Sequence, residues 1–189
     1  LDDGTDLDNG TVLFMQGTVY GEDGKPLPNA KVEVWHANSL GNYSFFDESQ
    51  SHFNLRRSII TDENGNYAFR SIVPLGYSVP PEGMTQKVLG ALGRHGHRPA
   101  HIHFFASADG HRKLTTQINI DGDEYLWDDF AFASREGLVP EVTMVEDADK
   151  LKEKALDKPY ASIDFDFHLV KDIDQAIQGS EVERRRAQG

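Results

Sequence analysis

Residues 62–70 read DENGNYAFR, a turn followed by a strand. The turn Asp62-Glu63-Asn64-Gly65 contains an Asn-Gly pair, which favours a tight hairpin because both residues accept a positive φ. After it, residues 66–70 alternate polar and apolar side chains, which is typical of a strand with one buried face. Before it, residues 57–61 form a short apolar run that could pair across the turn. This stretch therefore predicts antiparallel β-structure.

Strand patterns recur along the rest of the chain. Segments rich in β-branched and aromatic residues, or alternating in polarity, predict further strands at 11–20, 31–35, 101–106, 114–120 and 162–170. Helical patterns occur at 145–156 and 171–186, and long loops at 36–56, 74–100 and 121–142 could carry a site. We predict a mainly β protein, with an antiparallel β-sandwich over residues 1–170 and a short helical, partly frayed tail over 171–189.

The composition excludes several classes of function. The 189 residues, 38% of them hydrophobic, are enough for one domain with a core. The absence of cysteine excludes disulfides, thiolate nucleophiles and iron–sulfur clusters. A net charge of -12 argues against nucleic-acid binding. No apolar stretch approaches the roughly 20 residues of a membrane span, so we expect no membrane insertion.

Histidines concentrate in residues 95–103, which hold four of the eight in the chain. His101 and His103 are two apart on a predicted strand, so their imidazoles would share one face. Metal ligation and a pair of core or edge histidines both explain this spacing. Arg98 could bring a fixed positive charge to the same pocket. In a chain without cysteine, any remaining ligands must be His, Asp, Glu, Tyr or water.

Four separate motifs then resemble the intradiol ring-cleavage dioxygenases. They are GNYSFFD at 41–47, IVPLGY at 72–77, RPAHIHFF at 98–105 and LTTQ at 114–117. They occur in the order typical of that family, and the resemblance runs from about Leu1 to Pro140. Within the family, the chain is most similar to its catechol-cleaving members.

The resemblance implies a mononuclear, non-haem Fe(III) centre in a catalytic domain. Its protein ligands would be Tyr43, Tyr77, His101 and His103, with hydroxide or water as a fifth ligand. Two phenolates and one hydroxide balance the three positive charges, and neutral imidazoles complete the set. A site that is neutral overall suits a buried position.

The resemblance also assigns roles to the neighbouring residues. Arg98 would stabilise negative charge on the substrate ring, and Tyr77 would leave the iron and accept a substrate proton. Gln117 would donate a hydrogen bond near the iron-bound oxygen. Phe130 and Ala131 would contact the ring, although both could instead be ordinary core residues.

The implied reaction joins a small aromatic diol to O2. Catechol would open between its two oxygenated carbons to give cis,cis-muconate, in the β-ketoadipate route of aromatic degradation, with chlorocatechols, alkylcatechols and hydroxyquinol as alternative substrates. We expect a cytoplasmic homodimer whose natural chain extends upstream of Leu1. By resemblance, that upstream helical region makes the dimer interface and binds phospholipid.

Two alternatives stay open. His101 and His103 could join Asp121 or Glu124 in a ferrous site, or a third histidine in a zinc site. Residues 17–32 also resemble the opening hairpin of transthyretin-like sandwiches, many of which are not catalytic. We expect His95 and His97 to be solvated or to lie just outside the ligands.

Overall fold

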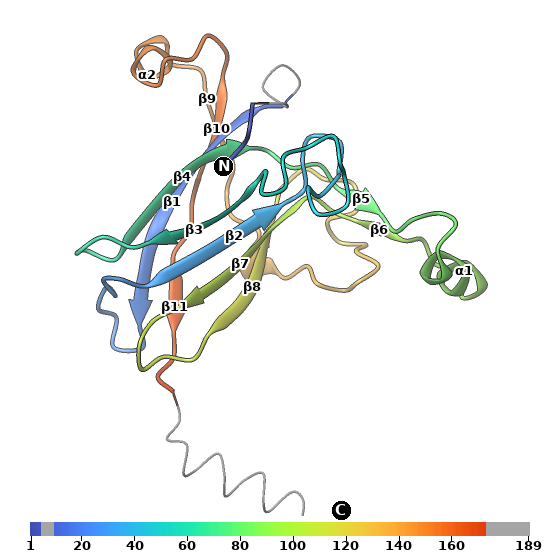
Figure 1. The fold of residues 1–189 in the computed structure, drawn as a ribbon, viewed down its shortest axis with the longest axis horizontal. Coiled ribbons are helices and arrows are strands. Elements are labelled where there is room, and N and C mark those ends of the chain that lie inside the picture. Colours follow the sequence, from blue (N-terminus) through green and yellow to red (C-terminus); the bar gives the residue numbers. More distant parts are fainter. Residues whose placement is uncertain (5–9, 173–189) are drawn as a thin grey trace, which may run out of the picture.

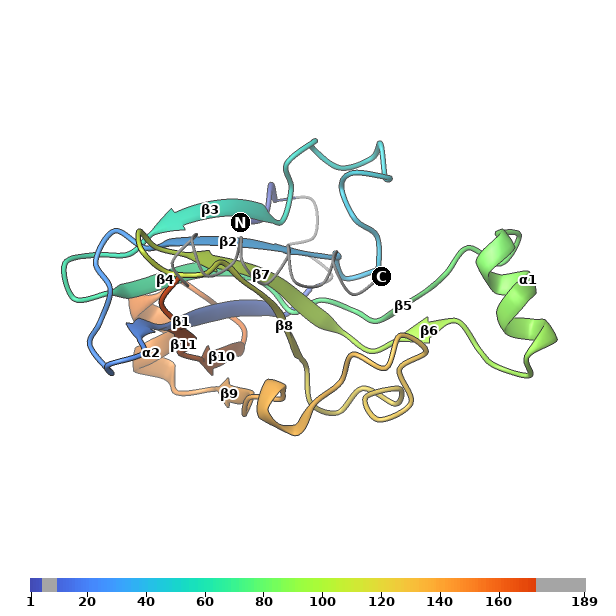
Figure 2. The ribbon, with the colours of Figure 1, turned by 90° about the horizontal axis from the view of Figure 1, so that it is seen from below.

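The structure is a computed structural model that describes residues 1–4 and 10–172 of the chain. Two β-sheets stack face to face (Figures 1 and 2). The first sheet holds β4 (Asn66–Ile72), β1 (Val12–Gly21), β10 (Tyr160–Asp164), β11 (Phe167–Leu169) and β9 (Thr143–Val145). The second has the order β3 (Arg56–Ile60), β2 (Lys31–His36), β7 (His101–Ser107) and β8 (Leu114–Asn119). The predicted β-sandwich is confirmed.

Alternation along the strands separates the core from the outer face of each sheet. On β7, Ile102, Phe104 and Ala106 are fully buried in the core between the sheets. Because neighbouring side chains on a strand point to opposite faces, His101 and His103 point away from that core. The sandwich therefore presents both imidazoles on the outer face of the second sheet, at the beginning of β7.

Strand β1 is the part of the fold that differs most from a purely antiparallel arrangement. Its first half pairs in parallel with β10 and its second half in parallel with β11, both with a register offset of 148 residues (Leu13 to Ala161, Val19 to Phe167). The predicted single strand at 162–170 is therefore two strands in one register, interrupted at Phe165 and Asp166. The interruption lies against Gly17, where an added Cβ would come within 1.8 Å of the Phe165 carbonyl oxygen.

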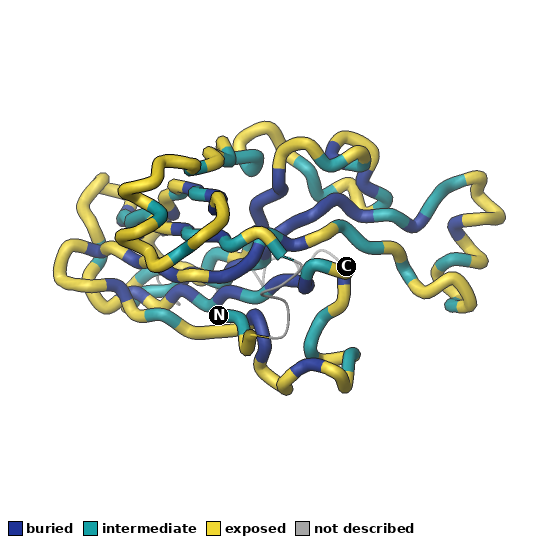
Figure 3. The backbone as a smooth tube through the Cα atoms, turned by 90° about the horizontal axis from the view of Figure 1, so that it is seen from above, coloured by how far each residue is buried: buried dark blue, intermediate teal, exposed yellow. Residues whose placement is uncertain are grey.

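An arm projects from the sandwich between residues 77 and 98 (Figure 1). Strands β5 (Tyr77–Ser78) and β6 (His97–Arg98) pair in an antiparallel ladder, and helix α1 (Met84–Ala91) lies beyond them. The arm is mostly exposed or half-buried, in contrast to the buried strands (Figure 3). The prediction of a loop over 74–100 missed this helix, which begins at Gly83 without a side-chain cap.

The remaining helices are short. A 3-10 turn covers Glu136–Leu138, and α2 covers Ala148–Glu153, where Asp147 caps the first backbone N–H groups. The helix predicted at 145–156 is therefore shorter than expected, because residues 143–145 form β9. The tail helix predicted at 171–186 lies outside the described residues from position 173 onward, so the division at residue 170 stays a prediction. None of the helices in the described part of the chain has the length and apolar composition to cross a membrane.

Candidate metal centre

The four predicted ligands come together at one end of the second sheet. Tyr43 comes from the loop after β2, and Tyr77 begins β5. The Tyr43 and Tyr77 rings lie 5.5 Å apart, and the Tyr77 and His101 rings also lie 5.5 Å apart. The imidazoles of His101 and His103 are 4.6 Å apart on β7.

Two glycines allow the tyrosine loops to approach each other. Gly41 has a φ of +82°, and a Cβ there would lie 2.7 Å from the carbonyl oxygen of Gly76. A larger residue at position 41 would be strained by its backbone and blocked by the neighbouring loop. The close approach of Gly41 to Gly76 thus helps to bring Tyr43 beside Tyr77.

His101 directs one ring nitrogen into the centre of this group. Its Nδ1 lies 2.6 Å from the carbonyl oxygen of Pro99, which places the ring proton on Nδ1 and a lone pair on Nε2. Around that lone pair lie Tyr43 Oη at 3.3 Å, Arg98 Nη1 at 3.1 Å and His103 Nε2 at 3.1 Å. Tyr43 Oη and His103 Nε2 both converge on this lone pair, so the three side chains could share a metal ion, whereas the Arg98 guanidinium is a cation and not a ligand. Fixing a ligating histidine through its other nitrogen is typical of metal sites.

His103 is held by stacking. Its ring lies 4.9 Å from the Trp35 ring, with the two planes inclined by 9°. Burial, with a smaller contribution from His101, lowers the pKa of His103 to about 3. Burial and the Arg98 charge lower the pKa of His101 to about 4. Both imidazoles are therefore neutral near pH 7, the form that binds metals.

The pKa of the Tyr43 phenol is raised, whereas the pKa values of His101 and His103 are lowered. Burial, reinforced by the neighbouring Tyr77, raises the pKa of Tyr43 above its ordinary value. A phenolate at this position therefore needs a cation beside it.

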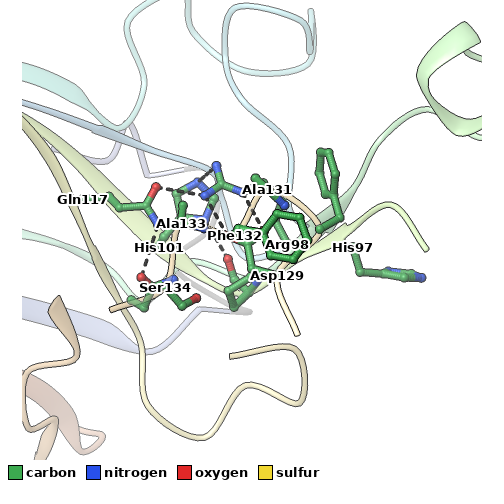
Figure 4. A network of polar contacts seen from close by, with 12 residues as sticks. His97, Arg98, His101, Gln117, Asp129, Ala131, Phe132, Ala133 and Ser134 are labelled. Atoms are coloured by element: carbon green, nitrogen blue, oxygen red, sulfur yellow. Dashed lines mark hydrogen bonds and ion pairs between the residues drawn. The ribbon is translucent and has the colours of Figure 1, made fainter. Parts of the chain in front are cut away.

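Arg98 occupies the centre of a buried polar network (Figure 4). Its Nη2 donates to Gln117 Oε1 at 2.9 Å, and its Nη1 contacts His101. The Asp129 carboxylate forms an ion pair with the same guanidinium at 3.2 Å. Burial alone would lower the pKa of Arg98, but the hydrogen bond and charge of Asp129, together with Tyr77, outweigh it and the pKa is raised. A permanent positive charge thus lies beside His101.

Phe130 and Ala131 follow Asp129 in an irregular loop. Phe130 is half-buried and Ala131 is exposed, so neither is an ordinary core residue. The loop is tied to the site through the Ala131 backbone N–H, which donates to Asp129 Oδ1 at 3.0 Å. Sequence reasoning placed these two residues near the site but missed Asp129 itself.

Comparison with known proteins shows which proteins this chain resembles. The family described as Dioxygenase matches residues 1–171. The chain belongs to the intradiol dioxygenase family. It is 73% identical over 146 residues to catechol 1,2-dioxygenase 2 of Acinetobacter lwoffii, covering 77% of this chain and 52% of that protein. It is 55% identical over 188 residues to catechol 1,2-dioxygenase of Acinetobacter baylyi, covering 98% of this chain and 60% of that protein.

Solved structures of intradiol dioxygenases share the fold as well. Wild-type catechol 1,2-dioxygenase of Acinetobacter radioresistens superposes with a TM-score of 0.89 at 58% sequence identity, covering 92% of this chain and 56% of that chain. The chain thus spans between about half and three fifths of the length of these relatives.

The histidines outside the four predicted ligands have other partners. His95 Nε2 pairs with Asp128 at 3.1 Å, while His97 stacks on Tyr125 with ring centres 4.4 Å apart. The buried His36 contacts the Ala37 carbonyl oxygen and the Ser71 hydroxyl with its two nitrogens.

The alternative metal sites find no support in the part of the chain that the structure describes. There, no three His, Asp or Glu side chains gather as a metal site, so a multidentate site needs the tyrosines. Asp121 and Glu124, the carboxylates considered for a ferrous site, are both exposed.

Proposed function

We propose that this chain is the catalytic part of a catechol 1,2-dioxygenase, which opens catechol with O2 to give cis,cis-muconate. The observation that carries the proposal is the convergence of two phenols and two neutral imidazoles beside a buried arginine. The names of the relatives support catechol as the substrate. The homodimer, the cytoplasmic location and the upstream phospholipid-binding region stay predictions.

The residues fit a ferric ion. Tyr43, Tyr77, His101 and His103 would hold it, and hydroxide or water would complete the set. Ferric iron is a hard, highly charged ion that stabilises phenolate, which offsets the burial that disfavours ionised Tyr43. When bound, the iron would make a coordinated catecholate electron-poor enough to react with O2.

The remaining chemistry belongs to the side chains. We assign to Tyr77, as a phenolate, the acceptance of one catechol proton on its Oη. Arg98 keeps its positive charge at any accessible pH, so its guanidinium can stabilise the charge that builds on the ring as it becomes a ketone. Gln117 is fixed between Arg98 and Asn119, with its Nε2 donating to Asn119 Oδ1 at 3.2 Å, and would orient oxygen atoms near the metal.

Phe130 and Ala131 supply the substrate contact in this proposal. An aromatic side chain followed by a small one leaves room for a flat ring against the Asp129 loop. This favours catechol over substituted catechols, since a ring substituent would need space on the same side.

Oxygen uptake and muconate formation with catechol test the proposal directly. Iron-loaded protein should consume one O2 for each muconate formed and should show the red colour of tyrosinate-to-iron charge transfer. Tyr77→Phe should shift that band and reduce turnover, whereas Tyr20→Phe, which alters a tyrosine stacked on His168 outside the site, should do neither. A colourless zinc protein from iron-replete cells, or a yellow extradiol aldehyde product, would contradict the assignment.

A further inference from the structure

The buried carboxylate of Asp129 makes four hydrogen bonds. Oδ1 accepts from Arg98 Nε at 3.2 Å and from the backbone N–H of Ala131 at 3.0 Å. Oδ2 accepts from Arg98 Nη2 at 3.2 Å and from the backbone N–H of Ala133 at 3.1 Å. One side chain therefore joins the guanidinium to the loop over residues 129–133.

The two bonds to Arg98 fix the direction of its third nitrogen. A guanidinium is planar, so holding Nε and Nη2 on one carboxylate sets the plane in which Nη1 lies. In this plane Nη1 lies 3.1 Å from His101 Nε2, and Nη2 also reaches Gln117 (Figure 4). Arg98 is only 9% exposed. Without Asp129, its guanidinium would lose its counter-ion and the two hydrogen bonds that orient its plane.

The two bonds to the backbone hold a strained loop. Phe132 has a φ of +52°, a region that costs energy for a residue with a side chain, and it lies between the two N–H groups bound by Asp129. Arg94, beyond α1, adds a second tie: its Nη2 donates to the Phe130 carbonyl oxygen at 2.7 Å, and its guanidinium lies 4.3 Å from the Phe132 ring centre. The conformation of the loop therefore depends on contacts from outside it.

We propose that Asp129 is a positioning residue, which sets the Arg98 charge and the Phe130–Ala131 wall at a fixed distance from each other. The inference rests on the proposed function, because the loop and the charge matter together only if a ring is bound between them. Asp129 touches no substrate and acts through Arg98 and the loop backbone.

Three variants of the complete gene product test this role. Asp129→Asn keeps the size but removes the charge, and Asp129→Glu keeps the charge but lengthens the side chain. Asp62→Asn is the matched control, because Asp62 Oδ1 also accepts from the N–H groups two and four residues ahead, at 2.9 and 2.8 Å, in the turn between β3 and β4.

We expect Asp129→Asn to lower kcat by about 10- to 100-fold, the range for lost support of a functional group. Asp129→Glu should have a higher kcat than Asp129→Asn, because Glu keeps the ion pair with Arg98. It should not reach the parent kcat, because the longer side chain does not keep the hydrogen bonds to the loop backbone. In metal-free protein, the Arg98 Nε–H signal in a ¹H–¹⁵N NMR spectrum should be sharp and exchange-protected in the parent and in Asp62→Asn, but lost in Asp129→Asn.

Failure of the proposed function and failure of the positioning role give different results. A parent protein that shows no ring cleavage refutes the proposed function, while the NMR signal still decides whether Asp129 holds Arg98. An active parent with unchanged kcat in Asp129→Asn refutes the positioning role alone. Equal losses in Asp129→Asn and Asp129→Glu reduce Asp129 to a structural turn residue. If Asp129→Asn does not fold, Asp129→Glu decides. A protected Arg98 Nε–H signal and partial kcat in Asp129→Glu support the positioning role, and the loss of one or both refutes it.

Discussion

His36 should make the metal-free protein sensitive to mild acid. The side chain is 1% exposed, with Nδ1 2.6 Å from the Ala37 carbonyl oxygen and Nε2 2.7 Å from Ser71 Oγ. Burial is the main cause that lowers its pKa from 6.5 to about 4. Between these two pH values the unfolded chain binds a proton at His36 and the folded chain does not. Stability is therefore lost as the pH falls through this window.

The size of the effect follows from the two pKa values. Linkage gives a loss in the free energy of unfolding of about 2 kcal/mol between pH 7 and pH 5, and of about 3 kcal/mol by pH 4. Other groups titrate in the same range, including His101 and His103 in the absence of metal. The contribution of His36 is therefore the difference between the parent and His36→Gln, in which the other groups cancel.

Urea unfolding at pH 7, 6 and 5 measures this difference. The stability advantage of the parent over His36→Gln should shrink by about 2 kcal/mol between pH 7 and pH 5. Parallel stability curves for the two proteins would mean that folding does not shift the pKa of His36, and would contradict the expected acid sensitivity.

Three further changes test the packing and the site. Phe104→Ala removes a fully buried ring between the sheets and should cost about 3–5 kcal/mol in urea unfolding; a loss below about 1 kcal/mol would contradict the assigned core. Gly17→Ala would place a Cβ 1.8 Å from the Phe165 carbonyl oxygen, and should lower the free energy of unfolding by about 3 kcal/mol or more, whereas a neutral effect would show that the strand junction can move. Trp35→Leu removes the ring stacked on His103 and should weaken iron binding about 10-fold in a chelator competition, with the far-ultraviolet circular dichroism unchanged; unchanged affinity would show that the stack does not orient the ligand.

Local patterns predicted the strands of the sandwich well. The alternation after the turn at 62–65 appears as β4, whose register against β1 is antiparallel. The expected hairpin was wrong, because the residues before the turn form β3, which pairs with β2 in the other sheet. The break in the last strand could not be predicted locally, because its contacts come from distant residues: Tyr67 Oη donates to the Phe165 carbonyl oxygen from 98 residues away. Helix α1 was missed because its eight residues follow prolines and begin without a capping side chain.

Some residues of the site could be predicted from the sequence, and others could not. The spacing of His101 and His103 indicated a shared face from first principles, whereas Tyr43 and Tyr77 were found only through motifs of a known family. Asp129 gave no such signal: its partner lies 31 residues away, and its turn resembles many exposed acidic turns. The contacts with Arg98 and with the backbone at 131 and 133 exist only in the folded chain.

The pairing of β1 with the last strands has a consequence for synthesis. Leu13 meets Ala161 across 148 residues, so one edge of β1 lacks its partner until almost the whole described chain has been made. At about 5–20 residues per second, a ribosome needs roughly 7–30 s to supply β10 after β1. During that interval an unpaired edge of β1 is open to other nascent chains, and a chaperone that covers β1 would protect it.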